Sequence, residues 1–164
     1  MKKPIDLEKE KQNFESFLAR KKTCVLSMID TNGEPFASTA PIVNVGQTFY
    51  IYISKIAEHF AFIQNSKVVD VMFVADEAEM NNHFATERAR FKCVPKNIGN
   101  DGHEQVFAMF AKIHGESMMN LLRTLDFSLF ALTPIEGRYV VGFGKAFNVT
   151  IDGTTFERVV VDKK

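Results

Sequence analysis

Apolar residues recur at two different spacings along the chain, and the change of spacing divides it into helical and extended segments. The first segment is expected to be a helix from Pro4, a residue suited to a first helical turn, to about Arg20. Its apolar positions fall on one helical face: Leu7, Phe14, Phe17 and Leu18. The spacing predicts an amphipathic helix that lies against the rest of the fold.

From Thr23 onward the pattern becomes typical of β-strands joined by short turns. The Asn-Gly pair within Asp30–Glu34 predicts a tight hairpin turn between a strand starting at Thr23 and a second arm at Pro35–Val43. Two further strands are expected at Phe49–Ile53 and Lys67–Ala75, the latter nearly all apolar and therefore central. Connections this short favour an antiparallel sheet.

Helical segments interrupt and follow these strands. Residues 54–65 predict a helix with Ser54 as a plausible N-cap, and its apolar face would carry Ile56, Phe60 and Ile63. An acidic turn or short helix is expected at Asp76–Met80. Two short helices are predicted at 103–113 and 116–124, followed by strands at 127–134 and 137–147 and a weak last strand near Asp152.

These elements together predict one mainly β domain of the α+β class. Six or seven strands in meander order, with helices segregated between or after them, favour a small antiparallel barrel. We expect a single domain over residues 1–164, in four parts. These are the N-terminal helix (1–20), the main barrel strands (23–97), a helical pair (102–124) and closing strands (127–162).

Composition narrows the classes of function. The chain has 46% hydrophobic residues and 16 Phe without any Trp, which predicts a soluble protein with a core rich in phenyl rings. Its net charge of zero argues against nucleic acid as a partner. Cys24 and Cys93 form neither a disulfide framework nor a metal pattern, and no signal peptide or long apolar run is present. We therefore expect a cytoplasmic protein that does not bind a membrane.

The stretch Thr86–Cys93 is the strongest candidate for a ligand-binding segment in the sequence. As a strand it would present Arg88, Arg90 and Lys92 on one face, because successive side chains point to opposite sides. A row of cations needs anionic partners, and a phosphate or propionate group suits an arginine fork. The ordinary alternative is a solvated edge strand whose charges prevent aggregation. The stretch alone leaves both interpretations open.

The sequence offers little support for hydrolase, kinase or metal-dependent chemistry. No hydrolase or kinase motif is present, and the four histidines are too scattered for a metal motif: His59, His83, His103 and His114. What remains is an anion site assembled from Ser54, Lys55, Arg88 and Arg90 beside the small-residue strand Ser38–Ile42. Such a site would suit a phosphorylated planar ligand such as FMN.

Several blocks then carry a resemblance to a known family. They are Ala37–Val43, Phe49–Ser54 with Glu58-His59, Asp76–Glu79, Ala85–Cys93, Leu122–Phe127 and Leu132–Ala146. With these blocks in this order, the chain resembles the pyridoxamine 5′-phosphate oxidase-like FMN-binding split-barrel superfamily, and within it the haem-utilisation branch called the HugZ/HutZ family. The match runs over nearly the whole chain.

The resemblance implies a six-stranded antiparallel split β-barrel that works as a homodimer, with two equivalent cofactor sites at the subunit interface. In flavin-binding relatives the phosphate position maps onto Arg88, Arg90, Ser54 and Lys55, with His59 as a further contact. The flavin ring would follow the strand segment Ser38, Thr39, Ala40 and Pro41. In the haem branch the same interface holds haem, and an arginine of the cationic strand meets a propionate.

One departure from the haem branch concerns the iron ligand. Haem-degrading members carry an axial histidine in a C-terminal extension, and this sequence has no histidine after His114. Asp126 corresponds to the carboxylate that supports that histidine, so a structural role for it is expected here. The leading expectation is an FMN-binding redox protein linked to haem utilisation. The alternatives are a haem-binding or haem-degrading protein of the HugZ type, and a non-catalytic module that stores or delivers either small molecule.

Overall fold

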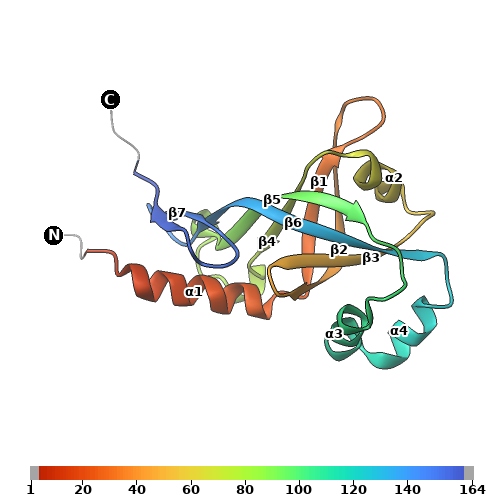
Figure 1. Cartoon of the computed structure of the whole chain (residues 1–164). Coiled ribbons are helices and arrows are strands. Elements are labelled where there is room, and N and C mark those ends of the chain that lie inside the picture. Colours follow the sequence, from red (N-terminus) through yellow and green to blue (C-terminus); the bar gives the residue numbers. More distant parts are fainter. Residues whose placement is uncertain (1–3, 161–164) are drawn as a thin grey trace.

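The computed structural model describes residues 4–160, so residues 1–3 of the predicted segment 1–20 and residues 161–162 of the predicted segment 127–162 lie outside it. Strands and helices follow one another along the chain (Figure 1). In order they are α1 (Leu7–Arg20), β1 (Thr23–Ile29), β2 (Pro35–Val45), β3 (Thr48–Ser54), α2 (Glu58–Asn65), β4 (Val69–Val74), the 3₁₀ turns Glu77–Glu79 and His83–Ala85, β5 (Arg88–Asn97), α3 (Glu104–His114), α4 (Glu116–Leu122), β6 (Phe127–Val140), β7 (Ala146–Val149) and β8 (Phe156–Arg158).

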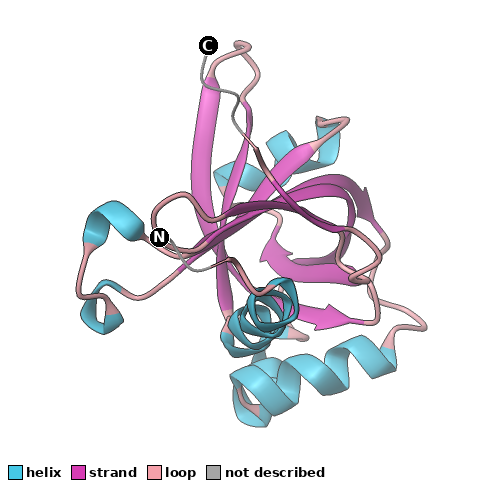
Figure 2. Cartoon of the chain, turned by 90° about the vertical axis from the view of Figure 1, so that its left-hand side faces the viewer, coloured by secondary structure: helices cyan, strands magenta, loops and turns pink. Residues whose placement is uncertain are grey.

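The strands form one antiparallel sheet that closes on itself. Its order is β3-β2-β1-β4-β5-β6-β7-β8, and β3 also pairs with β6. That extra pairing joins the two ends of a six-stranded ring, as in Figure 2, where the strands curl around a common interior. The predicted mainly β, six-stranded antiparallel barrel is therefore confirmed, with β7 and β8 as an extension beyond it.

Phenyl rings fill the interior of the barrel, as the composition predicted. Phe49 packs edge-on against both Phe73 and Phe91, with ring centroids 5.3 Å apart in each pair. Helix α1 adds Phe14 and Phe17, which are 2% and 0% exposed and pack against Tyr139. The predicted amphipathic helix is thus laid across one mouth of the barrel, with its apolar face turned inward.

Two predicted helix starts are wrong by several residues. Helix α1 begins at Leu7 rather than at Pro4, because Asp6 caps it by accepting a hydrogen bond from the backbone N–H of Lys9 at 3.1 Å. Helix α2 begins at Glu58 rather than at Ser54, and Ala57 is its N-cap. Ile56 therefore lies outside the helix and is 90% exposed, so it has no place on the predicted apolar face.

The closing strands are also joined differently from the prediction. Residues 127–140 form the single strand β6, although two separate strands were predicted at 127–134 and 137–147. Pro134 pairs with Cys93, next to a register shift at which Ile135 is the extra residue of β6, and such a bulge tolerates a residue without an N–H. At Gly137 a Cβ atom would approach the Phe91 ring to 2.7 Å. This glycine is therefore required by close packing and does not end the strand.

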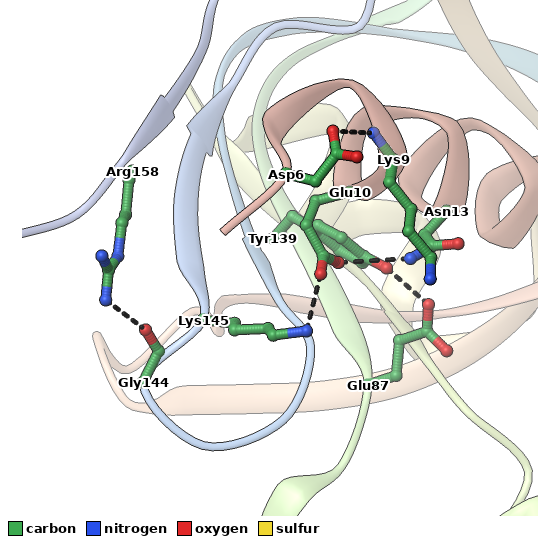
Figure 3. Close-up of polar contacts among 9 residues, drawn as sticks. All are labelled: Asp6, Lys9, Glu10, Asn13, Glu87, Tyr139, Gly144, Lys145 and Arg158. Carbon is green, nitrogen blue, oxygen red and sulfur yellow. Dashed lines mark hydrogen bonds and ion pairs between the residues drawn. The ribbon is translucent and has the colours of Figure 1, made fainter. Parts of the chain in front are cut away.

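Helix α1 is joined to the hairpin between β6 and β7 by an ion pair whose carboxylate is buried. The Lys145 ammonium donates to Glu10 Oε1 at 2.6 Å, and the Glu10 side chain is 6% exposed (Figure 3). Nearby, the Tyr139 hydroxyl donates to Glu87 Oε1 at 2.6 Å. The charge-assisted bond between Lys145 and Glu10 helps to hold α1 on the sheet.

Candidate functional site

The cationic stretch forms a strand that is paired on both sides. Strand β5 lies between β4 and β6 in the sheet, so its charges do not protect a free edge. Its inward residues Ala89, Phe91 and Cys93 are all 0% exposed. The outward residues are Arg88, Arg90 and Lys92, which we call the cationic face. The predicted alternation is confirmed, and the edge-strand alternative is wrong.

The three cations of this face have unequal partners. The guanidinium of Arg90 lies 3.2 Å from Asp70 Oδ2, and the Lys92 ammonium lies 3.2 Å from Glu136 Oε1. Arg88 instead donates to a backbone carbonyl, that of Thr86, at 3.0 Å. Arg88 and Arg90 are both exposed. An arginine bound only to a neutral carbonyl retains donors for an anionic ligand.

The predicted small-residue strand contributes two of its four residues to the same outer surface. The register runs from Arg90 through Met72 and Val25 to Thr39, and Pro41, two residues beyond Thr39, pairs with Thr23 of β1. Three strand spacings separate Arg90 from Thr39, or about 14 Å along the sheet. Thr39 and Pro41 are exposed on this surface.

The other two residues of that segment point to the opposite side. Ala40 is 2% exposed and belongs to the barrel core. The Ser38 hydroxyl lies 2.7 Å from His59 Nδ1, so the fold joins these two predicted site residues directly. Burial lowers the pKa of His59, which keeps the imidazole neutral near neutral pH.

Ser54 and Lys55 are engaged with Asp126, and no contact joins them to Arg88 or Arg90. The Ser54 hydroxyl donates to Asp126 Oδ1 at 2.9 Å and accepts from the Ile56 N–H at 3.3 Å. The Lys55 backbone N–H donates to the Asp126 carbonyl at 3.1 Å. Ser54 was expected to offer a helix N-terminus to an anion, but this end of β3 places a carboxylate there instead.

The sequence interpretation missed one arginine, on the neighbouring strand. Arg138 of β6 lies directly opposite Arg90, and Asn148 of β7 lies opposite Arg138. All three line a surface groove of about 310 Å³. The alternation of Gly137, Arg138 and Tyr139 indicated a strand, but nothing local revealed that this strand would pair with the cationic one.

Within residues 4–160, no cluster of three or more His, Cys, Asp or Glu side chains is arranged to hold a metal ion. A separate test of the same residues finds no helix with the length and apolarity needed to cross a membrane.

Comparison with known proteins gives a consistent set of relatives. The chain is 34% identical to the protein named heme oxygenase HutZ of Vibrio cholerae over 138 residues, which cover 83% of this chain and 78% of HutZ. No protein-family profile matches the chain.

Two solved structures resemble the fold closely. Campylobacter jejuni ChuZ superposes with a TM-score of 0.86 and 26% identity, covering 99% of this chain and 68% of ChuZ. The structure of Vibrio cholerae HutZ, described as a heme storage protein, gives a TM-score of 0.74 and 31% identity over 84% of this chain and 98% of HutZ. The chain belongs to the HugZ/HutZ haem-utilisation branch of the pyridoxamine 5′-phosphate oxidase-like split-barrel superfamily.

Proposed function

We propose that this protein binds haem in haem utilisation, at a site shared by two copies of the chain. The observation that carries the proposal is the cationic face, where Arg88 is exposed and bonded only to a backbone carbonyl. The relative with 34% identity is named a heme oxygenase. The expected FMN-linked redox role has no comparable support, so haem takes precedence over FMN as the proposed ligand.

The carboxylate end of haem fits the residues that are present. A haem carries two propionates, and a guanidinium recognises a carboxylate through two parallel N–H donors. Arg88 and Arg90 are spaced two residues apart on one face of β5, so their side chains point the same way. Met72 and Val74 pair directly with the two arginines, and Val25, Thr39 and Pro41 continue the same outer surface over the next two strands, so this surface carries few charges.

Haem iron would need a donor from the protein, and His59 has the properties of one. A ligating imidazole is neutral and commonly has its other ring nitrogen held by a hydrogen bond. His59 meets both conditions, because burial lowers its pKa and Ser38 holds its Nδ1 at 2.7 Å. Its Nε2 would then be the iron donor. When bound, haem supplies the redox and oxygen chemistry, while these residues position it.

A homodimer would bring these parts together. His59 lies in the first turn of α2, and none of the hydrogen bonds or ion pairs found among residues 4–160 joins it to Arg88 or Arg90. A second copy that packs on the outer strand surface would bury the exposed Thr39 and Pro41 and could complete a site with its own residues. We therefore propose a homodimer with the ligand at the interface, as the family resemblance implies.

Haem titration followed by absorption tests the proposal. We expect a Soret band that saturates at one haem per chain, and a solution mass twice the 18.6 kDa of one chain. His59→Ala should move the Soret maximum, because it changes the axial donor, whereas the exposed His83→Ala should leave it in place. A yellow protein with a flavin spectrum and no Soret response would replace haem by FMN. Binding of neither ligand would refute a cofactor site.

A further inference from the structure

We propose that Arg90 and Arg138 form a two-arginine clamp for one oxyanion, in the groove where β5, β6 and β7 run side by side. The clamp accepts a carboxylate or a phosphate group. Its assignment to a haem propionate rests on the proposed function, whereas the clamp itself rests only on the geometry of the groove.

The two arginines are directly opposed across an antiparallel pair. Arg90 of β5 and Arg138 of β6 are register partners, and directly opposite side chains have Cβ atoms about 5 Å apart. Like charges in this position destabilise a sheet. An anion bound between both guanidinium groups offsets that repulsion. Relief of the repulsion therefore contributes favourably to the free energy of anion binding.

The charges already present offset only part of this repulsion. Arg90 is paired with Asp70 at 3.2 Å, and Lys92, which also lines the groove, is paired with Glu136 at 3.2 Å. Arg138 takes part in none of the ion pairs found among residues 4–160. Arg138 is therefore the cation of this groove with its donors available.

The groove adds hydrogen-bonding groups around the two arginines. Asn148 lies opposite Arg138 on the other side, so three donor-bearing residues follow one another across three strands. Thr150 and Thr155 line the same groove. A volume of about 310 Å³ has room for a carboxylate or phosphate group and part of the molecule that carries it.

Inorganic phosphate tests the clamp without any cofactor. In ¹⁵N-labelled protein, we expect the side-chain Nε–Hε signals of Arg90 and Arg138 to shift together and to saturate during a phosphate titration. Arg158 serves as the matched control, since it is exposed on β8, donates to the Gly144 carbonyl and does not line the groove. Its signal should not saturate. In Arg138→Gln the apparent phosphate affinity at Arg90 should fall by about tenfold or more.

A haem experiment then identifies the source of the oxyanion. Haem and its dimethyl ester, in one detergent-containing buffer, are titrated into wild type, Arg138→Gln and Arg158→Gln. We expect Arg138→Gln to weaken haem binding by about tenfold while leaving the ester unaffected, because only free haem offers a charged carboxylate. Arg158→Gln should match wild type with both ligands. FMN and riboflavin, compared in the same way, test a phosphate source.

The outcomes separate the two proposals. No saturable phosphate shift at Arg90 and Arg138 would overturn the clamp, even if haem binds elsewhere. A saturable shift with equal haem affinity in wild type and Arg138→Gln would overturn the assignment to a propionate. A saturable shift in a protein that binds no haem would support the clamp and refute the proposed function.

Discussion

The barrel has two outer surfaces that differ in burial and in the partners of their charged residues. On one, which we call the covered face, α3 and α4 pack over β2, β3 and β6 and bury Val43, Tyr52 and Leu129. On the other, the outward side chains of β5 include the exposed Arg88 and Arg90. The same closed sheet therefore provides a second hydrophobic core on one side and a charged surface on the other.

Arginine shows the difference most clearly. Arg123, beside the covered face, donates to both oxygens of Glu104 at 3.0 and 2.7 Å, and its guanidinium lies 4.1 Å from the centroid of the Phe107 ring. Its side chain is 37% exposed, and that of Arg90 is 53% exposed. Exposure hardly separates them, but their partners do. An arginine with a bidentate carboxylate and an aromatic ring stabilises structure, whereas one with spare donors is available for a ligand.

Removing the aromatic anchor of the covered face should have the largest effect. Phe107 is 3% exposed and packs edge-on against Tyr52, with centroids 5.2 Å apart. Phe107→Ala should lower the free energy of unfolding by about 3–5 kcal/mol, measured by urea denaturation. The haem affinity of the folded fraction should be unchanged. A parallel loss of affinity would mean that the two faces are coupled.

Substitutions on the cationic face should have the reverse effects: they should weaken haem binding and leave the unfolding free energy nearly unchanged. Arg88→Ala and Arg90→Ala should each weaken haem binding by about 1.5–3 kcal/mol, measured by Soret titration, because each removes a charge-assisted hydrogen bond. Their unfolding free energies should stay close to wild type. Arg123→Ala is the matched control and should leave haem affinity intact. If all three behaved alike, the distinction drawn from their partners would be wrong.

Two buried tyrosines offer a smaller and more precise test. The Tyr52 hydroxyl is buried without a hydrogen-bond partner among residues 4–160, whereas the Tyr139 hydroxyl donates to Glu87. Tyr52→Phe should raise the free energy of unfolding by about 1 kcal/mol, and Tyr139→Phe should lower it by a similar amount. Denaturant midpoints of the two variants, compared with wild type, should therefore move in opposite directions. A loss of stability in both would indicate an unrecognised partner for Tyr52.

The smallest effect should come from His59 and appear only in acid. Burial lowers the pKa of His59 from 6.5, so below that pH the unfolded chain takes up a proton more readily than the folded protein. Stability should therefore fall as the pH drops below about 6.5, and level off once the folded pKa is passed. His59→Gln should remove this component. The unfolding free energy of the variant, measured against pH, should therefore fall less in acid than that of wild type. A curve parallel to wild type would contradict it.

Much of the fold could be predicted from local patterns. The hairpin at Asp30–Glu34 was predicted correctly because Gly33 takes the positive φ of 77° that the turn requires. The alternation of β5 was also correct, since its inward residues are wholly apolar. Helices α3 and α4 were found within one or two residues from their apolar spacing.

The errors arise where distant segments decide the local structure. The sequence predicted a break between residues 134 and 137, but β6 runs through it, and the missing side chain of Gly137 makes room for Phe91. Ser54 has the chemistry of an N-cap, but Asp126, far along the chain, binds its hydroxyl and the helix starts later. No sequence motif around Arg138 indicates a function. Its importance comes from the pairing of β5 with β6, which no periodicity within either strand reveals.

The ring closure by β3 and β6 has a consequence for how the chain acquires its structure. The partners Phe49 and Leu132 are separated by about half of the chain, and the chain must close this long loop before the two strands can pair. Until β6 has been synthesised, β3 and β5 both expose unpaired backbone edges, which are templates for aggregation. We expect folding to be late and cooperative, with slow hydrogen exchange appearing in all six ring strands together.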